Sequence, residues 1–427
     1  MKSTNLFLAA AALCAVLFSG CSSTPTEETQ GVVNVVEALK NLQPLKASQL
    51  GSKIRFIPLE TTDSSLIGAH WSLVEAGDHI IINNNSYGVS TDVKDILVFD
   101  GKSGKFISGI GHKGQGPNDY SYPSYAMSAD RSKIYFAAAS GSGWVGYDMS
   151  DKFIGKILPE LSNTITGVIK VGGLYSVDDS IAYLFDRRDV WSRELIFKKF
   201  TLDGRLLDST VVFQGQKLNE IDLSNVQSLT LYTHEVGFNK GKQSVSGLSI
   251  NGGDVKVLPG LHNQLVNGKN HIREELSDTI FSLAKDGSYP TLVFDLGEKR
   301  FPSSQKNLRL PNSDELLMAQ VYETPSKVLF SLSQGWPGDD SHKEYIGIYN
   351  VKSGQTVVGS ADDGIADDLS DFMPFNPIMN TSSGEFAGVV TMDEIYKWLD
   401  EHPDAKMPEW AEGLDAESNP IIVIISD

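Results

Sequence analysis

Residues 95–120 of the chain read Asp95-Ile-Leu-Val-Phe-Asp100-Gly-Lys-Ser-Gly104-Lys-Phe-Ile-Ser-Gly-Ile-Gly111-His-Lys-Gly114-Gln-Gly116-Pro117-Asn-Asp-Tyr120. The apolar run up to Asp100 predicts a β-strand, the glycine- and serine-containing residues after it a tight turn, and the residues after Gly104 a second strand. A glycine-rich loop then leads into the following part of the chain. We interpret this pattern as one edge of a β-propeller blade.

The first half of this pattern recurs along the chain. Similar hairpins occur at residues 146–154, 199–207 and 347–354. The turns are about 50 residues apart, which is typical of propeller repeats, and the length of the chain allows six to eight such blades. The first and last strands of a ring must pair, because an open ring leaves a row of unpaired backbone groups. Residues 55–60 and 421–425 are the candidates for this closure, and a buried strand of a β-sandwich is the alternative for the second run.

Two further segments have a readable local structure. We expect one strand over residues 73–83, a turn-rich segment at 83–88 and another strand over 93–99. Between Met392 and Glu412, apolar residues recur at helical spacing until Pro403 ends the run, so we expect a short helical insertion there.

The amino-terminal residues predict where the protein is located in the cell. Lys2 precedes an apolar run too short to span a bilayer, which ends in Phe18-Ser-Gly-Cys21. Residues 1–20 therefore predict a lipoprotein signal peptide, and Cys21 is the residue that would carry the lipid. An ordinary secreted protein with Cys21 at the cleavage site is the alternative. The other cysteine, Cys14, leaves with the signal peptide, so the mature chain has no disulfide.

The rest of the chain divides into two parts in this interpretation. We expect a polar tether over residues 21–48 and a single all-β propeller over residues 49–427, closed by its first and last strands. The predicted location is the outer membrane, on its periplasmic or surface-exposed face, held by the lipid anchor. The acidic pair Glu27 and Glu28, close to the anchor, resembles a surface-export signal of Bacteroides-type lipoproteins.

The charge of the chain excludes one class of partner. Acidic residues outnumber basic ones by 54 to 36, the net charge is -18, and the excess is spread along the sequence. Because phosphate backbones would be repelled, we expect no nucleic-acid partner.

Three motifs together resemble a known family. They are the opening Phe56-Ile-Pro-Leu-Glu60-Thr-Thr, the strand Ile96-Leu-Val-Phe-Asp100 and the loop Ile110-Gly-His-Lys-Gly-Gln-Gly-Pro-Asn-Asp-Tyr120. The chain is similar to the six-bladed β-propeller lipoproteins of Bacteroides-type bacteria, distant relatives of NHL-repeat proteins. The resemblance implies six blades and an exported, lipid-anchored protein. Function in that family is largely uncharacterised, so the resemblance implies no catalytic residue.

The glycine-rich loop and two other segments supply candidate ligand-binding residues. Glycines can expose backbone N–H groups to an anion, although their simpler role is to permit a tight crossover between blades. The loop offers His112, Gln115 and Tyr120. Trp336, which we expect to face outward, and Asp371 complete the set, whereas Trp144 and Tyr147 alternate within a strand and are expected in the core.

Metal and catalytic motifs are weak in this sequence. Asp362, Asp363 and Asp367 lie close together and allow calcium as an alternative to a solvated acidic loop, but their spacing does not match an EF-hand. We expect no other metal or cofactor, because the histidines form no paired ligand motif. The acid pairs Asp186 with Asp189 and Glu274 with Glu275 are surface charge unless they face one another across a cleft.

These observations predict a non-enzymatic binding or scaffold propeller whose ligand is a glycan or a peptide. The alternative is a carbohydrate-active hydrolase or lyase with carboxylates at the channel mouth. A further alternative is a structural partner of an outer-membrane protein, which would require a large exposed apolar patch.

Overall fold

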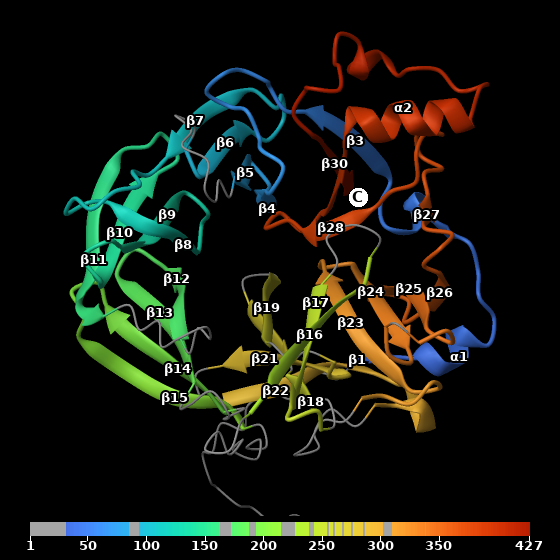
Figure 1. Ribbon diagram of the computed structural model, residues 1–427, viewed down its shortest axis with the longest axis horizontal. Coiled ribbons are helices and arrows are strands. Elements are labelled where there is room, and N and C mark those ends of the chain that lie inside the picture. The colour runs from blue at the N-terminus through green and yellow to red at the C-terminus, as the bar shows by residue number, and fades with distance from the viewer. Residues whose placement is uncertain are drawn as a thin grey trace, which may run out of the picture.

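The computed structural model describes residues 31–84, 94–162, 172–187, 194–214, 227–238, 243–253, 256–258, 261–266, 269–274, 276–284, 287–301, 310–337 and 339–427. In these parts of the chain the structure is mostly β. Short sheets stand side by side around a central opening, and the helices are few and peripheral (Figure 1). The arrangement is that of a β-propeller.

Three of the sheets have four antiparallel strands each. They consist of β4 (Ser72–Ala76), β5 (His79–Asn83), β6 (Ile96–Asp100) and β7 (Phe106–Ile110); of β23 (Leu316–Glu323), β24 (Lys327–Gln334), β25 (Lys343–Asn350) and β26 (Thr356–Ser360); and of β28 (Pro377–Asn380), β29 (Phe386–Val390), β30 (Ile421–Ser426) and β3 (Lys53–Pro58).

A larger sheet contains two antiparallel halves, which are joined by parallel pairing of β8 with β12. The first half is β8 (Tyr120–Ser128), β9 (Lys133–Ala138), β10 (Ser142–Asp148) and β11 (Phe153–Ser162), and the second is β12 (Gly172–Val177), β13 (Ile181–Arg187), β14 (Glu194–Thr201) and β15 (Leu206–Gln214).

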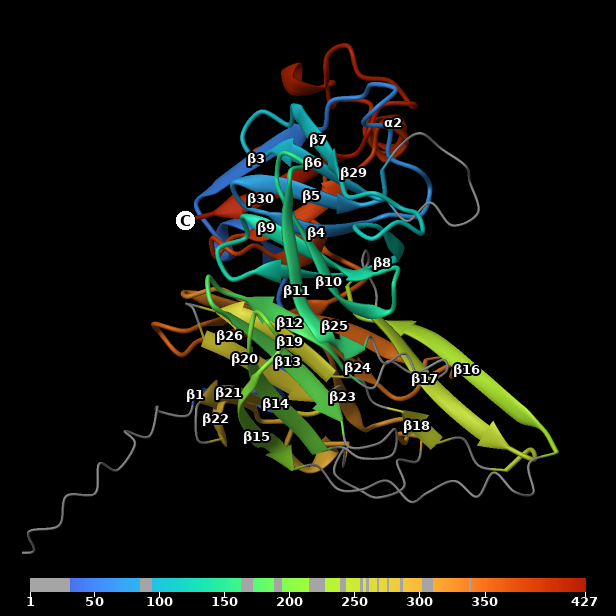
Figure 2. The ribbon, with the colours of Figure 1, turned by 90° about the vertical axis from the view of Figure 1, so that its left-hand side faces the viewer.

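The remaining strands form one further unit of the ring and two small additions. The ring unit is β19 (Leu261–Val266), β20 (Lys269–Glu274), β21 (Thr279–Ala284) and β22 (Gly287–Phe294), extended by β1 (Gly31–Val33). A three-stranded sheet of β16 (Leu229–Val236), β17 (Gln243–Ile250) and β18 (Lys256–Leu258) projects from the ring (Figure 2). The strands β2 (Leu45–Lys46) and β27 (Ile365–Ala366) pair with each other.

The predicted strand over residues 73–83 is wrong as a single element. It is two strands, β4 and β5, which a turn at Gly77 and Asp78 reverses. Ile80, Ile81 and Ile82 are all fully buried. Because apolar and polar residues therefore do not alternate in β5, the sequence pattern does not mark it as a separate strand. Of the other two predicted segments, 85–88 and the first residue of 93–99 lie outside the described residues, and β6 begins at Ile96.

The repeated hairpins share a turn chemistry. Asp100 accepts hydrogen bonds at Oδ1 from the backbone N–H groups of Lys102, at 3.2 Å, and Ser103, at 2.8 Å. The hydroxyl of Ser103 and these N–H groups hold the pKa of Asp100 below its usual value. Asp148 and Asn350 bind the backbone of their own turns in the same way. Each of these turns joins the third and fourth strands of its unit, so the sequence repeat reflects a repeated turn.

The strand pairing expected to close the ring is confirmed. β3 pairs antiparallel with β30 along its whole length, from Lys53 opposite Ser426 to Pro58 opposite Ile421. Alternate residues of β30 then pack against different neighbours. Ile422 and Ile424 belong to one buried cluster, with residues of β5 and β6, whereas Val423 and Ile425 belong to another, with residues of β24 and β25.

The predicted polar tether over residues 21–48 is wrong for its second half. Val33 in β1, which pairs in parallel with β22, is fully buried, and so is Val35 in α1 (Val35–Leu39). Leu45 and Ala47 belong to the buried cluster that contains Val423 and Ile425 of β30. Residues 31–48 therefore form a packed strap along the outside of the ring, because their apolar side chains alternate with polar ones and can be buried. Residues 21–30 lie outside the described residues.

The predicted helical insertion is confirmed as α2 (Met392–Glu401). Thr391 caps its first turn, and Glu394 binds the backbone N–H of Thr391 in return at 2.8 Å. Met392 and Ile395 are buried against the ring. No helix in the described part of the chain is long and apolar enough to cross a membrane.

Replacing Ile424 with Ala is expected to lower the free energy of unfolding by about 2–5 kcal/mol, because the side chain is 1% exposed and a cavity would remain in the closing strand. Urea denaturation measures the change. The matched control is Ile107→Ala, at a side chain that is 43% exposed, where a change within about 0.5 kcal/mol is expected. Equal effects of the two substitutions would contradict a closure that depends on β30.

Candidate functional site

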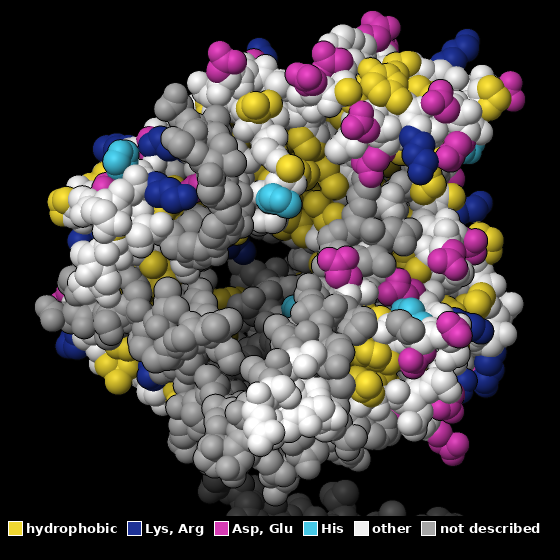
Figure 3. All heavy atoms as spheres, viewed as in Figure 1, with side chains coloured by type: hydrophobic (Ala, Val, Ile, Leu, Met, Phe, Trp, Pro, Cys, Tyr) yellow, Lys and Arg dark blue, Asp and Glu magenta, His cyan; other side chains and the backbone are white. Residues whose placement is uncertain are grey.

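A cavity of about 850 Å³ occupies the centre of the ring. Figure 3 shows the hollow on one face of the molecule. Its wall is formed largely by β4, β8, β12, β19, β23 and β28, each at one end of its sheet or half-sheet. Because these strands converge from all sides, a ligand in the cavity would contact several units of the ring at once.

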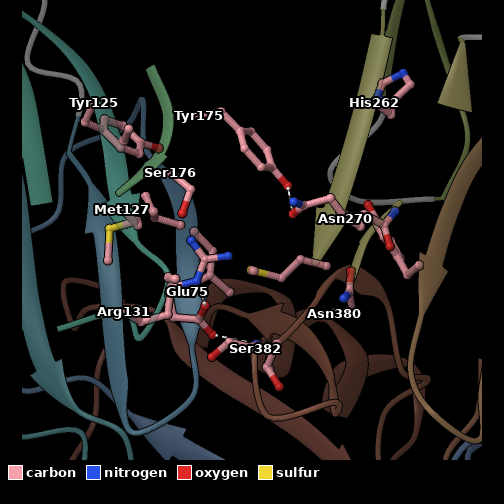
Figure 4. A pocket seen from close by; sticks show the side chains of 18 of the residues that line it. Glu75, Tyr125, Met127, Arg131, Tyr175, Ser176, His262, Asn270, Asn380 and Ser382 are labelled. Atoms are coloured by element: carbon pink, nitrogen blue, oxygen red, sulfur yellow. Dashed lines mark hydrogen bonds and ion pairs between the residues drawn. The ribbon is translucent and has the colours of Figure 1, made fainter. Parts of the chain in front are cut away.

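Tyrosines and amides make up much of this wall. The tyrosines are Tyr125, Tyr175, Tyr183 and Tyr322, and the amides are Gln264, Asn270, Gln320 and Asn380. The hydroxyl of Tyr175 donates a hydrogen bond of 2.7 Å to Oδ1 of Asn270 (Figure 4). This bond joins the unit of β12 to that of β20.

Burial keeps the cavity tyrosines in their neutral form. It raises the pKa of Tyr125 to about 12 and, with a small opposing effect from the charge of Arg131, that of Tyr175 to about 12 as well. Burial also raises the pKa of Tyr322 strongly. These phenols therefore remain hydrogen-bond donors at any physiological pH.

The two carboxylates in the wall already have protein partners. Glu75 accepts hydrogen bonds at Oε1 from the backbone N–H groups of Ala76 and Ser382, each at 3.0 Å, and its Oε2 lies 3.5 Å from Nε of Arg131. Burial would raise the pKa of the second carboxylate, Asp178, but hydrogen bonds from the backbone of Ser180 and neighbouring donors lower it below its usual value.

The second arginine of the wall is also engaged. Arg273 is 4% exposed, and its guanidinium donates to the backbone carbonyl oxygens of Ser277 and Met318, each at 3.2 Å. Its charge is therefore compensated by the protein backbone. The wall combines two arginines and two carboxylates with a large number of neutral hydrogen-bonding groups.

The glycine-rich loop between β7 and β8 is filled by its own aspartate. Asp119 accepts a hydrogen bond of 2.6 Å from the backbone N–H of Gly116, and its Oδ1 lies 3.0 Å from Nδ1 of His112. A Cβ atom at Gly114 would come within 2.3 Å of Oδ2 of Asp119. The glycines thus allow the carboxylate to approach, as a crossover requires. His112 and Gln115 are exposed but do not line the cavity, and a ligand role for them stays a prediction.

Two predicted ligand-binding aromatics lie in the core. Tyr120 is 1% exposed, stacks on Phe136 at 4.4 Å and donates to Oδ2 of Asp95 at 3.0 Å. The outward orientation expected for Trp336 is wrong. After the turn at Gly335, where φ is +76°, the ring of Trp336 is buried with Val236 and other apolar side chains.

Two other aromatics behave as the sequence predicts. Trp144 and Tyr147 are both buried, which confirms their expected place in the core.

The acidic residues proposed for calcium do not converge. Asp362 and Asp363 are exposed, whereas Asp367 is buried and accepts hydrogen bonds from the backbone N–H groups of Leu369, at 3.0 Å, and Ser370, at 2.9 Å. In the described part of the chain, no group of three acidic, histidine or cysteine side chains is placed to hold a metal ion. Asp371 is exposed in the same loop and is not part of the cavity wall.

The acid pairs singled out in the sequence are only partly described. Asp189 and Glu275 lie outside the described residues. Glu274 is 8% exposed.

Sequence analysis did not identify most residues of the cavity wall, because finding them requires knowing where each repeat unit begins. Glu75, Tyr175 and Asn380 lie on or beside the innermost strand of their units, and the innermost strand is recognised only when the unit boundaries are known. The glycine-rich loop leads directly into β8, so it could have pointed to Tyr125 in that strand.

The sheets around a central channel define a protein of the β-propeller class. The chain belongs to the family described as a domain of unknown function (DUF4934), whose profile matches residues 30–426. No curated protein sequence matches the chain.

Solved structures from two Bacteroides species are similar. An assumed exported protein (BF0058) from Bacteroides fragilis NCTC 9343 superposes with a TM-score of 0.55 at 14% identity, covering 92% of this chain and 98% of that one. A member of the DUF4221 family from Bacteroides vulgatus ATCC 8482 has a TM-score of 0.45 at 10% identity, covering 88% and 96% of the two chains. At these identities, the first likeness shows the fold alone.

The raised pKa values predict a loss of stability in alkali. Tyr125 has a pKa of about 12 in the folded protein and near 10.0 when exposed, so its contribution is complete below pH 10 and declines as the pH rises towards 12. The free energy of unfolding should fall over this interval by about 1–3 kcal/mol because of Tyr125. The measurement is urea denaturation at a series of pH values.

Two variants separate this effect from general alkaline damage. Tyr125→Phe is expected to flatten the decline, whereas Tyr396→Phe, at a side chain on the surface that is 39% exposed, should leave it unchanged. An unaltered decline in Tyr125→Phe would show that the Tyr125 phenol is not buried in solution.

Proposed function

We propose that this protein is an exported, lipid-anchored β-propeller that binds a short glycan in its central channel and does not act as an enzyme. The observation that carries the proposal is the cavity of about 850 Å³, whose wall presents tyrosine hydroxyls and amides from several ring units. Its volume falls within the range of roughly 300–1,000 Å³ that is typical of small-ligand sites. Hydroxyls and amides that converge from several sides suit a sugar, which carries hydroxyls around its rings.

The carboxylates of the wall favour binding over hydrolysis. A glycosidase needs one carboxylic acid with a raised pKa and a second carboxylate across the bond to be cleaved. Hydrogen bonds lower the pKa of Asp178, and Glu75 is held by two backbone N–H groups and Arg131. The hydrolase or lyase alternative therefore lacks a supporting observation in the described residues.

The blade count and the location are parts of the same proposal. If each half of the eight-stranded sheet is one blade, the ring has six, with the unit of β19–β22 and the three four-stranded sheets as the others. Export is supported by the signal-like residues before Cys21 and by the description of the Bacteroides fragilis relative. An outer-membrane protein partner stays a prediction.

Binding is tested with an array of short glycans and short peptides, followed by titration calorimetry with the full-length protein. The Asn380→Ala variant, in the cavity wall, should weaken glycan binding about five- to tenfold, because a hydrogen bond is lost. The exposed Asn41→Ala serves as the control and should bind as the parent does. Binding of peptides alone, or an equal effect of both substitutions, would contradict the proposal.

The anchor is tested separately by replacing Cys21 with Ser. The variant should no longer incorporate labelled palmitate in cells and should move from the membrane to the soluble fraction, because the acyl chains supply the membrane affinity. Retention of label or of membrane association in Cys21→Ser would show that the anchor is elsewhere.

A further inference from the structure

Arg131 has a backbone conformation that an arginine rarely adopts. It ends the turn between β8 and β9 with a φ of +59°, in the left-handed region that favours glycine. Turns elsewhere in the ring have Gly104, Gly204 and Gly354 in this region, and five other non-glycine residues of the described chain, such as Asp151, also adopt it. The chain therefore places a long cationic side chain where the backbone would accommodate a glycine more easily.

Glu75 contacts one edge of the Arg131 guanidinium, and the other edge faces the cavity. Its Nε lies 3.5 Å from Oε2 of Glu75, and the other oxygen of Glu75 is held by the backbone N–H groups of Ala76 and Ser382. Three units of the ring thus meet at this point. Within the described part of the chain, the buried Nε has this ion pair but no hydrogen bond, none of the hydrogen bonds involves an Nη nitrogen of Arg131, and the guanidinium points into the cavity (Figure 4).

The surroundings of Arg131 also suit an anionic group. Arg131 and Tyr175 both line the cavity, and the charge of Arg131 opposes the rise that burial causes in the pKa of Tyr175 (Figure 4). Arg273, the other arginine of the wall, is already engaged by backbone carbonyl oxygens. Arg131 is consequently the arginine of the described wall that can bind a ligand through its Nη atoms.

We propose that Arg131 binds the carboxylate of an acidic sugar, so that the channel selects uronate-containing oligosaccharides over neutral ones. This inference rests on the proposed glycan binding and adds the class of glycan. The planar fork of an arginine matches a carboxylate through two parallel N–H···O bonds. Glu75 fixes the opposite edge of the guanidinium, and the hydroxyl of Tyr175 with the amide of Asn270 meets the hydroxyls of the same sugar.

The experiment compares digalacturonate and trigalacturonate with the same oligosaccharides as methyl esters, which keep the shape but lose the charge. Titration calorimetry with the full-length protein should show binding of the acids about tenfold or more tighter than that of the esters. In Arg131→Gln this preference should disappear, and in Arg131→Lys it should be partly retained. Arg205→Gln, at an exposed arginine on the outer edge of the ring, is the control and should keep the preference.

The outcomes separate the inference from the proposed function. Equal affinities for acids and esters, or a preference that survives in Arg131→Gln, would overturn the role of Arg131 while leaving glycan binding in place. Binding of a peptide with a free carboxyl terminus, but of neither sugar, would overturn both proposals.

Because Glu75 loses its cationic partner in Arg131→Gln and keeps only its backbone hydrogen bonds, the folding of each variant is checked by thermal unfolding. The double variant Glu75→Gln with Arg131→Gln removes the unpaired carboxylate. It should also bind acids and esters alike, and a restored preference in it would contradict the role of Arg131.

Discussion

The pairing of β3 with β30 is the constraint on which the rest of the structure depends. Residues from opposite ends of the chain form one ladder, so that both ends of the ring are held in a single sheet. The closing strand is also a packing element, since Ile422 and Ile424 face one neighbouring unit and Val423 and Ile425 the other. The central cavity exists only because the inner strands are held at a fixed distance around it.

Sequence reasoning succeeded where the information is local. The turn after Asp100 and the helix that begins at Met392 each have their determinants within a few residues. It failed where burial is decided by distant partners. Trp336 is buried by side chains that include Val236, and Val33 is buried by pairing with β22. The cavity wall could not be predicted, because Glu75 and Arg131 come together only when adjacent units are assembled.

The glycine-rich loop and the cavity illustrate two opposite uses of polar groups. In the loop, the backbone N–H of Gly116 is satisfied by Asp119, so a feature that resembles an anion site in the sequence is a self-contained turn. In the cavity, phenols and amides from several ring units line an open space, and some of them, such as Tyr175 and Asn270, also bond to one another across units. Rigid placement on strands reduces the conformational entropy that the protein side chains would lose on binding a ligand. The difference in surroundings, rather than in residue type, distinguishes the two.

The strap formed by residues 31–48 determines how the ring would respond to mechanical load. A chain pulled at its amino end would draw β1 along the axis of β22, so that their parallel hydrogen bonds resist together in shear instead of opening one after another. The side chains of Val33 and Val35 are fully buried, so exposing them would also oppose this displacement. Tension applied at the amino end would thus act on the unit of β22 before it reached the closing pair of β3 and β30.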